Sequence, residues 1–256
     1  MTSELYKRSL YLNKNIDYLF GVDICEYDIE SAGLNIIKYY GLLPQDRITY
    51  LEGMSKEARN KQIGIYQRDD SVFKEALSEG FVNIRKEFFE LNEIEDDDIL
   101  SIKKDAIFTL DRRMRHTKIG NVTFKRKHSY TSYLYLDKKE IYVNTLMNMV
   151  EIKGLTDCSE HEGYMFDFFK RFCAINENSP NQDIAIDFIL EFIQKYRNKE
   201  LPNGYYRRLS KDNNFVVYDE LNDEWIEVND IDVSNYDVDI SYNYINYLIP
   251  LASIYL

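Results

Sequence analysis

A long amphipathic helix with β-type segments on both sides of it most constrains what this chain can fold into. Apolar residues recur at three- and four-residue steps from Val72 to Leu91, which is the spacing of one buried face of an α-helix. Runs of apolar and aromatic residues occupy Leu19 to Ile29, Ile99 to Leu110 and Thr123 to Leu136. These segments predict an α+β fold in which an antiparallel sheet is backed by helices.

Capping residues predict where the other N-terminal helices begin. Ser31 can cap a helix that ends at Gly41, because its side-chain oxygen can accept an otherwise unpaired backbone N–H. Ser55 opens a charged helix that runs toward Gln67, and Asp70 belongs to the polar segment that caps the long helix. Three helices are therefore predicted between the first and second β-type segments.

The pattern changes after about residue 150, where aromatic-rich helices replace the β-type segments. The predicted elements there are helices at 165–174 and 183–196, a short β element at 215–218, and an apolar helix or strand at 242–256. We therefore predict a domain at 1–150, with a helical insertion at about 44–92, and a mostly helical region at 151–256.

The composition is that of a folded chain with a sizeable core. Its 256 residues are 45% hydrophobic and 14% aromatic, which excludes a largely disordered protein. Its apolar stretches fall well short of the roughly 18 residues of a membrane span, and the N-terminus lacks the apolar segment of a secretory signal. The three cysteines are odd in number and lack metal-ligand spacing, which favours a reduced, cytoplasmic setting.

Basic residues are concentrated in one part of an acidic chain. The net charge is −12, which argues against wholesale coating of nucleic acid. In the segment 103–128, which we call the basic band, nine Lys or Arg residues stand against two Asp. They are Lys103, Lys104, Arg112, Arg113, Arg115, Lys118, Lys125, Arg126 and Lys127. The band has two interpretations, a groove that contacts phosphates or a solvated hairpin with ordinary surface charge.

Two aspartates have the sequence context of metal ligands. Asp28 stands at the end of a predicted strand with a helix directly behind it, and Asp105 lies inside an apolar β-type segment. Mg²⁺ prefers oxygen ligands, and two-metal nucleotidyl transfer needs carboxylates from separate strands that meet at a metal pair about 4 Å apart. The alternative for each residue is an ordinary capping or turn aspartate.

The segments around these aspartates resemble the palm motifs of family B DNA polymerases and, more loosely, those of family A. The first family motif is an Asp, two residues, Ser-Leu-Tyr-Pro and an aliphatic pair. This chain has Asp28, Ser31 and the pair Ile36-Ile37, whereas Ala32-Gly33-Leu34 replaces Leu-Tyr-Pro. The resemblance covers roughly residues 20–143.

Two further motifs follow in the family's order. In the Asp-Thr-Asp-Ser hairpin, Asp105 keeps the position of the metal-binding aspartate, and Lys103 replaces the first aspartate. The segment from Phe124 to Tyr130 is similar to the Lys-rich strand that contacts the primer–template backbone, with Lys127 and Tyr130 as the matching residues. The family's fingers motif, a Lys followed by Asn-Ser-x-Tyr-Gly, is absent.

This resemblance implies a template-directed DNA polymerase-like nucleotidyltransferase. Asp28 and Asp105 would hold two Mg²⁺ ions, with their carboxylates within about 8 Å of each other. The implied partners are primer–template or single-stranded DNA, deoxynucleoside triphosphates and, for so small a polymerase, a partner protein subunit. Residues 44–92 would correspond to the fingers and residues 151–256 to a thumb or an accessory region.

The resemblance also assigns the binding residues. Ser31 and three cations of the charged helix, Lys56, Arg59 and Lys61, are the candidates for the triphosphate, although that helix could also be a solvated face. The candidates for DNA are Lys103, Lys104, Lys125, Arg126, Lys127 and Tyr130. Tyr130 and Tyr133 offer ring faces on which a base could stack.

Two other functions fit the same sequence. A palm-derived nucleic-acid-binding or polymerase accessory subunit without catalysis would account for the missing fingers motif and for Lys103. A purely protein-binding module would leave the basic band unexplained. The high usage of Asn, Ile, Lys and Tyr indicates an AT-rich genome and a phage source, which would place the protein in the cytoplasm of a host cell.

Overall fold

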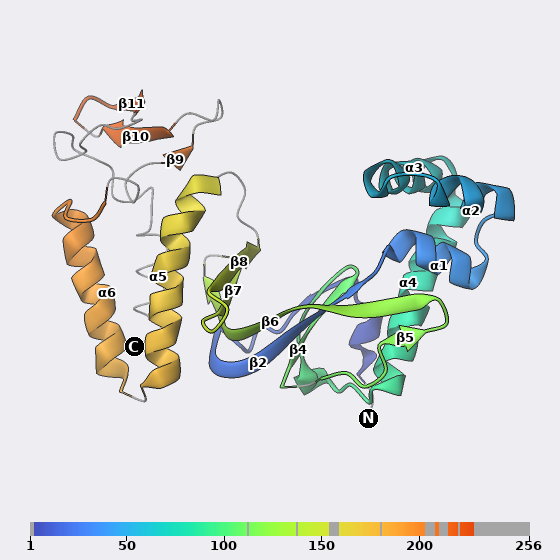
Figure 1. Ribbon diagram of the computed structural model, residues 1–256, viewed down its shortest axis with the longest axis horizontal. Helices are drawn as coiled ribbons and strands as arrows, with labels where there is room; N and C mark the ends of the chain where they lie inside the picture. Colours follow the sequence, from blue (N-terminus) through green and yellow to red (C-terminus); the bar gives the residue numbers. More distant parts are fainter. Residues whose placement is uncertain are drawn as a thin grey trace. The chain divides into compact units, whose positions relative to one another are not determined.

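In a computed structural model, the chain has an α+β fold, as the sequence predicts (Figure 1). The structure describes residues 3–111, 113–136, 138–153, 159–179, 181–202, 208–209, 215–219 and 221–227. Arg112 of the basic band and the predicted apolar element at 242–256 lie outside these residues.

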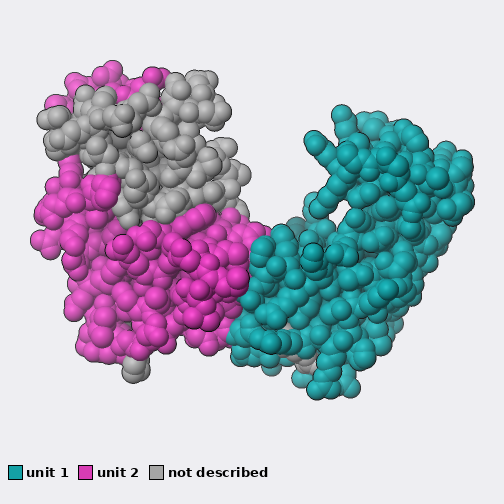
Figure 2. All heavy atoms as spheres, viewed as in Figure 1, with its two compact units in different colours: residues 1–15, 23–129 teal, residues 16–22, 130–256 magenta. Residues whose placement is uncertain are grey.

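The chain divides into two compact units, which share its two longest strands (Figure 2). The first unit is Met1–Asn15 with Asp23–Ser129, and the second is Ile16–Val22 with Tyr130–Leu256. The shared strands are β2 (Tyr18–Ile29) and β6 (Val122–Leu136). Each unit is therefore built around one part of β2 and one part of β6.

The main sheet has eight strands in the order β1-β3-β4-β2-β6-β7-β8, with β5 paired to β6. Its other strands are β1 (Leu10–Leu12), β3 (Ile99–Lys103), β4 (Ala106–Leu110), β5 (Lys118–Ile119), β7 (Lys139–Asn144) and β8 (Met149–Lys153). The hairpin β3–β4 pairs antiparallel with β1 on one side and with β2 on the other. Strands that are far apart in sequence, β2 and β4, therefore lie side by side.

The helices of the first unit mostly begin where the sequence predicts. They are α1 (Ala32–Tyr40), α2 (Gln45–Glu52), α3 (Lys56–Asp69) and α4 (Ser71–Leu91), with short 3-10 turns at Glu4–Lys7 and Asp96–Asp98. Ser55 Oγ accepts the Ala58 N–H at 3.3 Å, and Asp70 Oδ1 accepts the Phe73 N–H at 3.0 Å, which confirms both caps. The short helix α2 has no clear signal in the sequence, because only Ile48 and Leu51 mark its buried face.

The long helix α4 packs on one face of the sheet. The Phe88 ring stacks on Phe124 of β6 at a centroid distance of 3.9 Å and also contacts Tyr27 of β2 at 6.0 Å. All three side chains are buried. Because successive side chains of a strand point to opposite faces, Tyr27 faces α4 and its neighbour Asp28 faces the other way.

Two helices, α5 (Ser159–Asn178) and α6 (Gln182–Arg197), form the core of the second unit with β7 and β8. Phe168 and Phe192 are buried there, with ring centroids 4.6 Å apart. Asn181 caps α6, because its side chain accepts the Asp183 N–H. A small separate sheet contains β9 (Arg208–Leu209), β10 (Phe215–Asp219) and β11 (Glu224–Glu227). Of the helices that the structure describes, none has the length and apolar character of a membrane span.

Candidate active site

Asp28 and Asp105 lie beside each other in the sheet of the first unit. Asp28 is the penultimate residue of β2 and pairs in register with Ala106, the first residue of β4. Asp105 immediately precedes Ala106 in the turn of the β3–β4 hairpin, and its carbonyl accepts the Ile29 N–H at 3.3 Å. Asp28 therefore lies at the end of β2, and Asp105 lies in the turn that leads into the adjacent strand β4. Their carboxylate separation of about 8 Å stays a prediction.

The electrostatics of Asp28 suit a cation. Burial of this half-buried carboxyl group raises its pKa most, and the negative charge of Asp105 raises the pKa further. Lys127 and Lys56 lower the pKa of Asp28, and Glu26 raises it. Since a cation between two carboxylates relieves their repulsion, and since Mg²⁺ prefers carboxylate oxygens, this donor set fits Mg²⁺.

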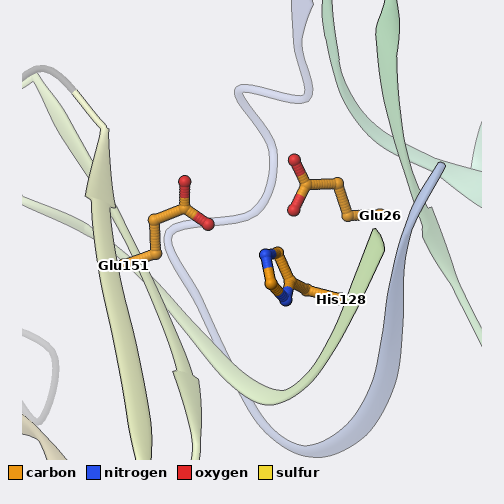
Figure 3. Close-up of side chains that lie close together, drawn as sticks. All are labelled: Glu26, His128 and Glu151. Atoms are coloured by element: carbon orange, nitrogen blue, oxygen red, sulfur yellow. The ribbon is translucent and has the colours of Figure 1, made fainter. Parts of the chain in front are cut away.

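Glu26 is a further carboxylate of the Asp28 face that the sequence analysis did not single out. Glu26 precedes Asp28 by two residues on β2, so both side chains point to the same face of the sheet. The residue is 1% exposed, and Lys127 Nζ lies 3.6 Å from its carboxylate. Figure 3 shows the side chains of Glu26 and His128 side by side, and a carboxylate oxygen and a ring nitrogen lie within 4.8 Å of each other. Glu26 and Lys127 thus form a charged pair beside Asp28.

Helix α3 brings two of the three predicted triphosphate-binding cations close to this face. The Arg59 guanidinium donates a hydrogen bond to Ser31 Oγ at 3.1 Å, directly behind β2. Lys56 is near enough for its charge to lower the pKa of Asp28. Lys61 follows Arg59 by two residues, about 200° around the helix, and is exposed. The structure therefore groups Lys56 and Arg59 with Asp28 and Ser31, but leaves Lys61 on another face of α3.

The predicted capping role of Ser31 is wrong. Ser31 is the N-cap residue of α1, but its backbone is left-handed (φ 45°) and its side chain makes no capping hydrogen bond. Its hydroxyl accepts from Arg59 instead. The first turn of α1 also packs closely against α3. A Cβ at Gly33 would lie only 3.1 Å from Ile63 Cδ1. Gly33, in the place of the family's Tyr, thus permits the close approach of α3.

The β3–β4 hairpin places one predicted DNA-contacting lysine on the Asp28 face. Lys103 pairs with Ala106, and Ala106 pairs with Asp28, so the three residues form one cross-strand row. Directly paired residues of an antiparallel sheet point to the same face. Lys104 occupies the turn, where it is exposed and has a left-handed backbone (φ 57°).

Strand β6 adds two lysines to the same face. Lys127 Nζ lies 3.6 Å from the carboxylate of Glu26, and Lys125 Nζ lies 3.9 Å from that of Glu30. Both lysine side chains are substantially exposed, at 44% and 67%. These two members of the basic band therefore remain accessible to phosphate groups beside Asp28.

Arg113 and Arg126 of the basic band do not join this face. Arg126, between the two lysines of β6, lies 4.0 Å from Asp23, and Arg113 lies 3.4 Å from the same carboxylate. Asp23 belongs to the other face of β2, because its carboxylate accepts from the thiol of Cys25, which is buried in the core. Arg113 therefore lies on the opposite face of the sheet from Lys125 and Lys127, and Arg126 faces away from them.

The predicted stacking role of Tyr130 and Tyr133 is also wrong. Both residues are 0% exposed in the second unit, so neither ring face can receive a base. The Tyr130 ring packs against Tyr142 at 5.1 Å, and its hydroxyl donates to Glu151, a residue of β8 in the same unit. An aromatic residue in a strand can equally be a core residue, and here both tyrosines are.

Comparison with known proteins places the chain among phage proteins. Residues 1–256 match the model of a family described as Bacteriophage PBS1 gene 130 protein. The match agrees with the phage source that the residue usage indicates. A search of curated proteins found no match.

Proposed function

We propose that this chain, which belongs to the Bacteriophage PBS1 gene 130 protein family, is a phage DNA polymerase-like nucleotidyltransferase that works in the host cytoplasm; the family match supports only the phage source. One observation carries this proposal. Asp28 at the end of β2 lies beside the β3–β4 turn that carries Asp105, and the cations Lys56 and Arg59 of α3 approach the same end of β2. Carboxylates for a metal next to cations for phosphates are what nucleotidyl transfer needs.

Each group has a defined task in this proposal. Asp28 and Asp105 would hold Mg²⁺, which lowers the pKa of an attacking 3′-hydroxyl and stabilises the leaving pyrophosphate. Lys56 and Arg59 bind the triphosphate of a deoxynucleotide, with Arg59 leaving Ser31 to do so. Lys125, on the face of Asp28, contacts the backbone of the primer–template.

Primer extension with the purified chain tests the proposal. Asp28→Asn and Asp105→Asn should each abolish Mg²⁺-dependent incorporation of deoxynucleotides, because each removes a metal-binding charge without removing core packing. Asp46→Asn on α2 is the matched control, since Asp46 is exposed and outside the site. Incorporation that survives either site variant at the wild-type rate would contradict the proposal.

A second candidate function is a palm-derived nucleic-acid-binding or accessory subunit without catalysis. Lys103 favours it, because a cation stands in one cross-strand row with Asp28 where the polymerase family has a carboxylate. A wild-type chain that binds primed DNA, incorporates nothing alone, and stimulates a partner polymerase subunit would establish this function instead.

A further inference from the structure

Arg85 of α4 is a buried arginine whose guanidinium donates to three backbone carbonyls of the described residues. The residue is 2% exposed, and α4 is the helix that packs on one face of the sheet of the first unit. One terminal nitrogen donates to the carbonyls of Tyr6, at 2.7 Å, and Arg8. The other donates to the carbonyl of Lys104 at 2.9 Å. Arg85 therefore ties the N-terminal segment and the β3–β4 turn to one helix.

Burial of this charge is costly, and core packing alone does not require it. Within the part of the chain that the structure describes, no carboxylate forms an ion pair with Arg85. Burial lowers its pKa to about 10, and the negative charge of Asp105 opposes that shift. A buried guanidinium is tolerated when its donors are satisfied and a charge of opposite sign is near. Asp105 is the carboxylate that supplies this charge.

The turn that carries Asp105 is fixed at its backbone on both sides. The Lys104 N–H donates to the Ser9 carbonyl at 2.7 Å, and the Asp105 carbonyl accepts the Ile29 N–H at 3.3 Å. Lys104 itself has a left-handed backbone, which is unfavourable for a residue with a Cβ. An unfavourable turn conformation persists only where surrounding contacts hold it, and Arg85 provides one of them.

We propose that Arg85 is a positioning residue that holds the β3–β4 turn so that the Asp105 carboxylate is presented to a divalent cation beside Asp28. This inference rests on the proposed function, in which Asp105 is a metal ligand. Arg85 touches neither metal nor substrate. It acts through the carbonyl of Lys104, the residue next to Asp105.

Binding of Mn²⁺ to the full chain, followed by the electron paramagnetic resonance signal of free Mn²⁺, tests the inference without any need for catalysis. Arg85→Met should weaken Mn²⁺ binding about tenfold, the usual effect of removing a group that orients a metal ligand. Arg85→Lys should lose affinity as well, by a smaller factor, because an ammonium lacks the planar fork that reaches several carbonyls. Arg85→Lys also provides the test of Mn²⁺ binding if the Arg85→Met protein fails to fold.

Asn92→Ala is the matched control. Asn92 is buried at the end of the same helix, and its side chain forms hydrogen bonds with the Arg115–His116 backbone, which lies outside the β3–β4 turn that carries Asp105. It should lower thermal stability while leaving the Mn²⁺ affinity within about twofold of wild type, well below the tenfold effect expected at Arg85.

Two results would overturn the role of Arg85 alone: wild-type Mn²⁺ affinity in Arg85→Lys or Arg85→Met, or an equal loss of affinity in Asn92→Ala at the same loss of thermal stability. Asp105→Asn distinguishes a failure of the proposed function from a failure of the Arg85 role alone. Mn²⁺ affinity that does not change in Asp105→Asn would contradict the proposed function itself, and this inference with it.

Discussion

At the scale of single residues, the second unit contains buried tyrosine hydroxyls in contrasting environments. The Tyr133 hydroxyl is fully buried and has no hydrogen-bond partner among the described residues. Burial raises its pKa, so the group stays protonated. The Tyr142 hydroxyl, equally buried, donates to Glu140 at 2.8 Å. The two rings lie 5.1 Å apart, so they share one environment and differ in whether the hydroxyl is satisfied.

Replacing each tyrosine by Phe should therefore have opposite effects on the free energy of unfolding. Tyr133→Phe removes an unsatisfied polar group and should leave stability unchanged or raise it by about 1 kcal/mol. Tyr142→Phe removes the donor to a buried carboxylate and should cost about 1–3 kcal/mol. Urea unfolding of both variants measures the difference. A Tyr133→Phe protein less stable than Tyr142→Phe would show that the Tyr133 hydroxyl has a partner.

At the scale of the elements, two glycines in helices distinguish the effect of helix propensity from the effect of packing between helices. Gly80 of α4 lies where that helix meets α1, and a Cβ there would be 2.7 Å from Ile36 Cγ2 and 3.2 Å from Tyr40 Cδ2. Ile36 is fully buried and cannot move aside freely. Gly64 of α3 has open space where its Cβ would be. Only Gly80 is therefore required by the contact between helices.

Gly64→Ala should stabilise the first unit by about 0.5–1 kcal/mol, because alanine favours a helix interior over glycine. Gly80→Ala should destabilise it by about 1–3 kcal/mol, since the clash with Ile36 outweighs the same gain in propensity. Chemical denaturation compares the two variants directly. Equal stabilisation by both would mean that α1 and α4 do not pack as closely as the structure has them.

At the scale of the whole molecule, sequence patterns predicted the helices and strands that show a local periodicity. They did not predict the roles of residues whose contacts are distant in sequence. The period of apolar residues in α4 and the apolar segments around Asp28 and Asp105 were enough to predict α4, β2 and the β3–β4 hairpin. Arg85 left no local signal, because it bonds to carbonyls 19 to 79 residues away in sequence. Tyr130 was misjudged for the same reason: its burial depends on strands that follow it.

Short elements escaped prediction for a related reason. Strand β1 has three residues, too few to show an alternating pattern, and it is defined by pairing with β3 some ninety residues later. The sequence of β8 mixes apolar and charged residues, and its pairing with β7 is what defines it as a strand. The division of the basic band between two faces likewise follows from the register of β6 beside β2.

Because the basic band is divided between two faces of the sheet, we can predict which of its residues bind DNA. The net charge of −12 repels a polyanion, so binding must rely on cations that are gathered on one face. Lys125 and Lys127 lie on the face of Asp28, whereas Arg113 and Arg126 pair with Asp23 on the other. The two pairs carry equal charge, so one serves as the control for the other.

The chain should bind primed or single-stranded DNA at low salt, with an affinity that falls as salt rises, because each phosphate contact releases condensed counterions. Lys125→Ala with Lys127→Ala should weaken binding and reduce the log–log salt slope by about 1–2, the share of two phosphate contacts. Arg113→Ala with Arg126→Ala removes the same charge and should leave the slope nearly unchanged. Fluorescence anisotropy of labelled oligonucleotides across a salt series measures both. Equal effects of the two double variants would mean that DNA responds to net charge and not to the Asp28 face.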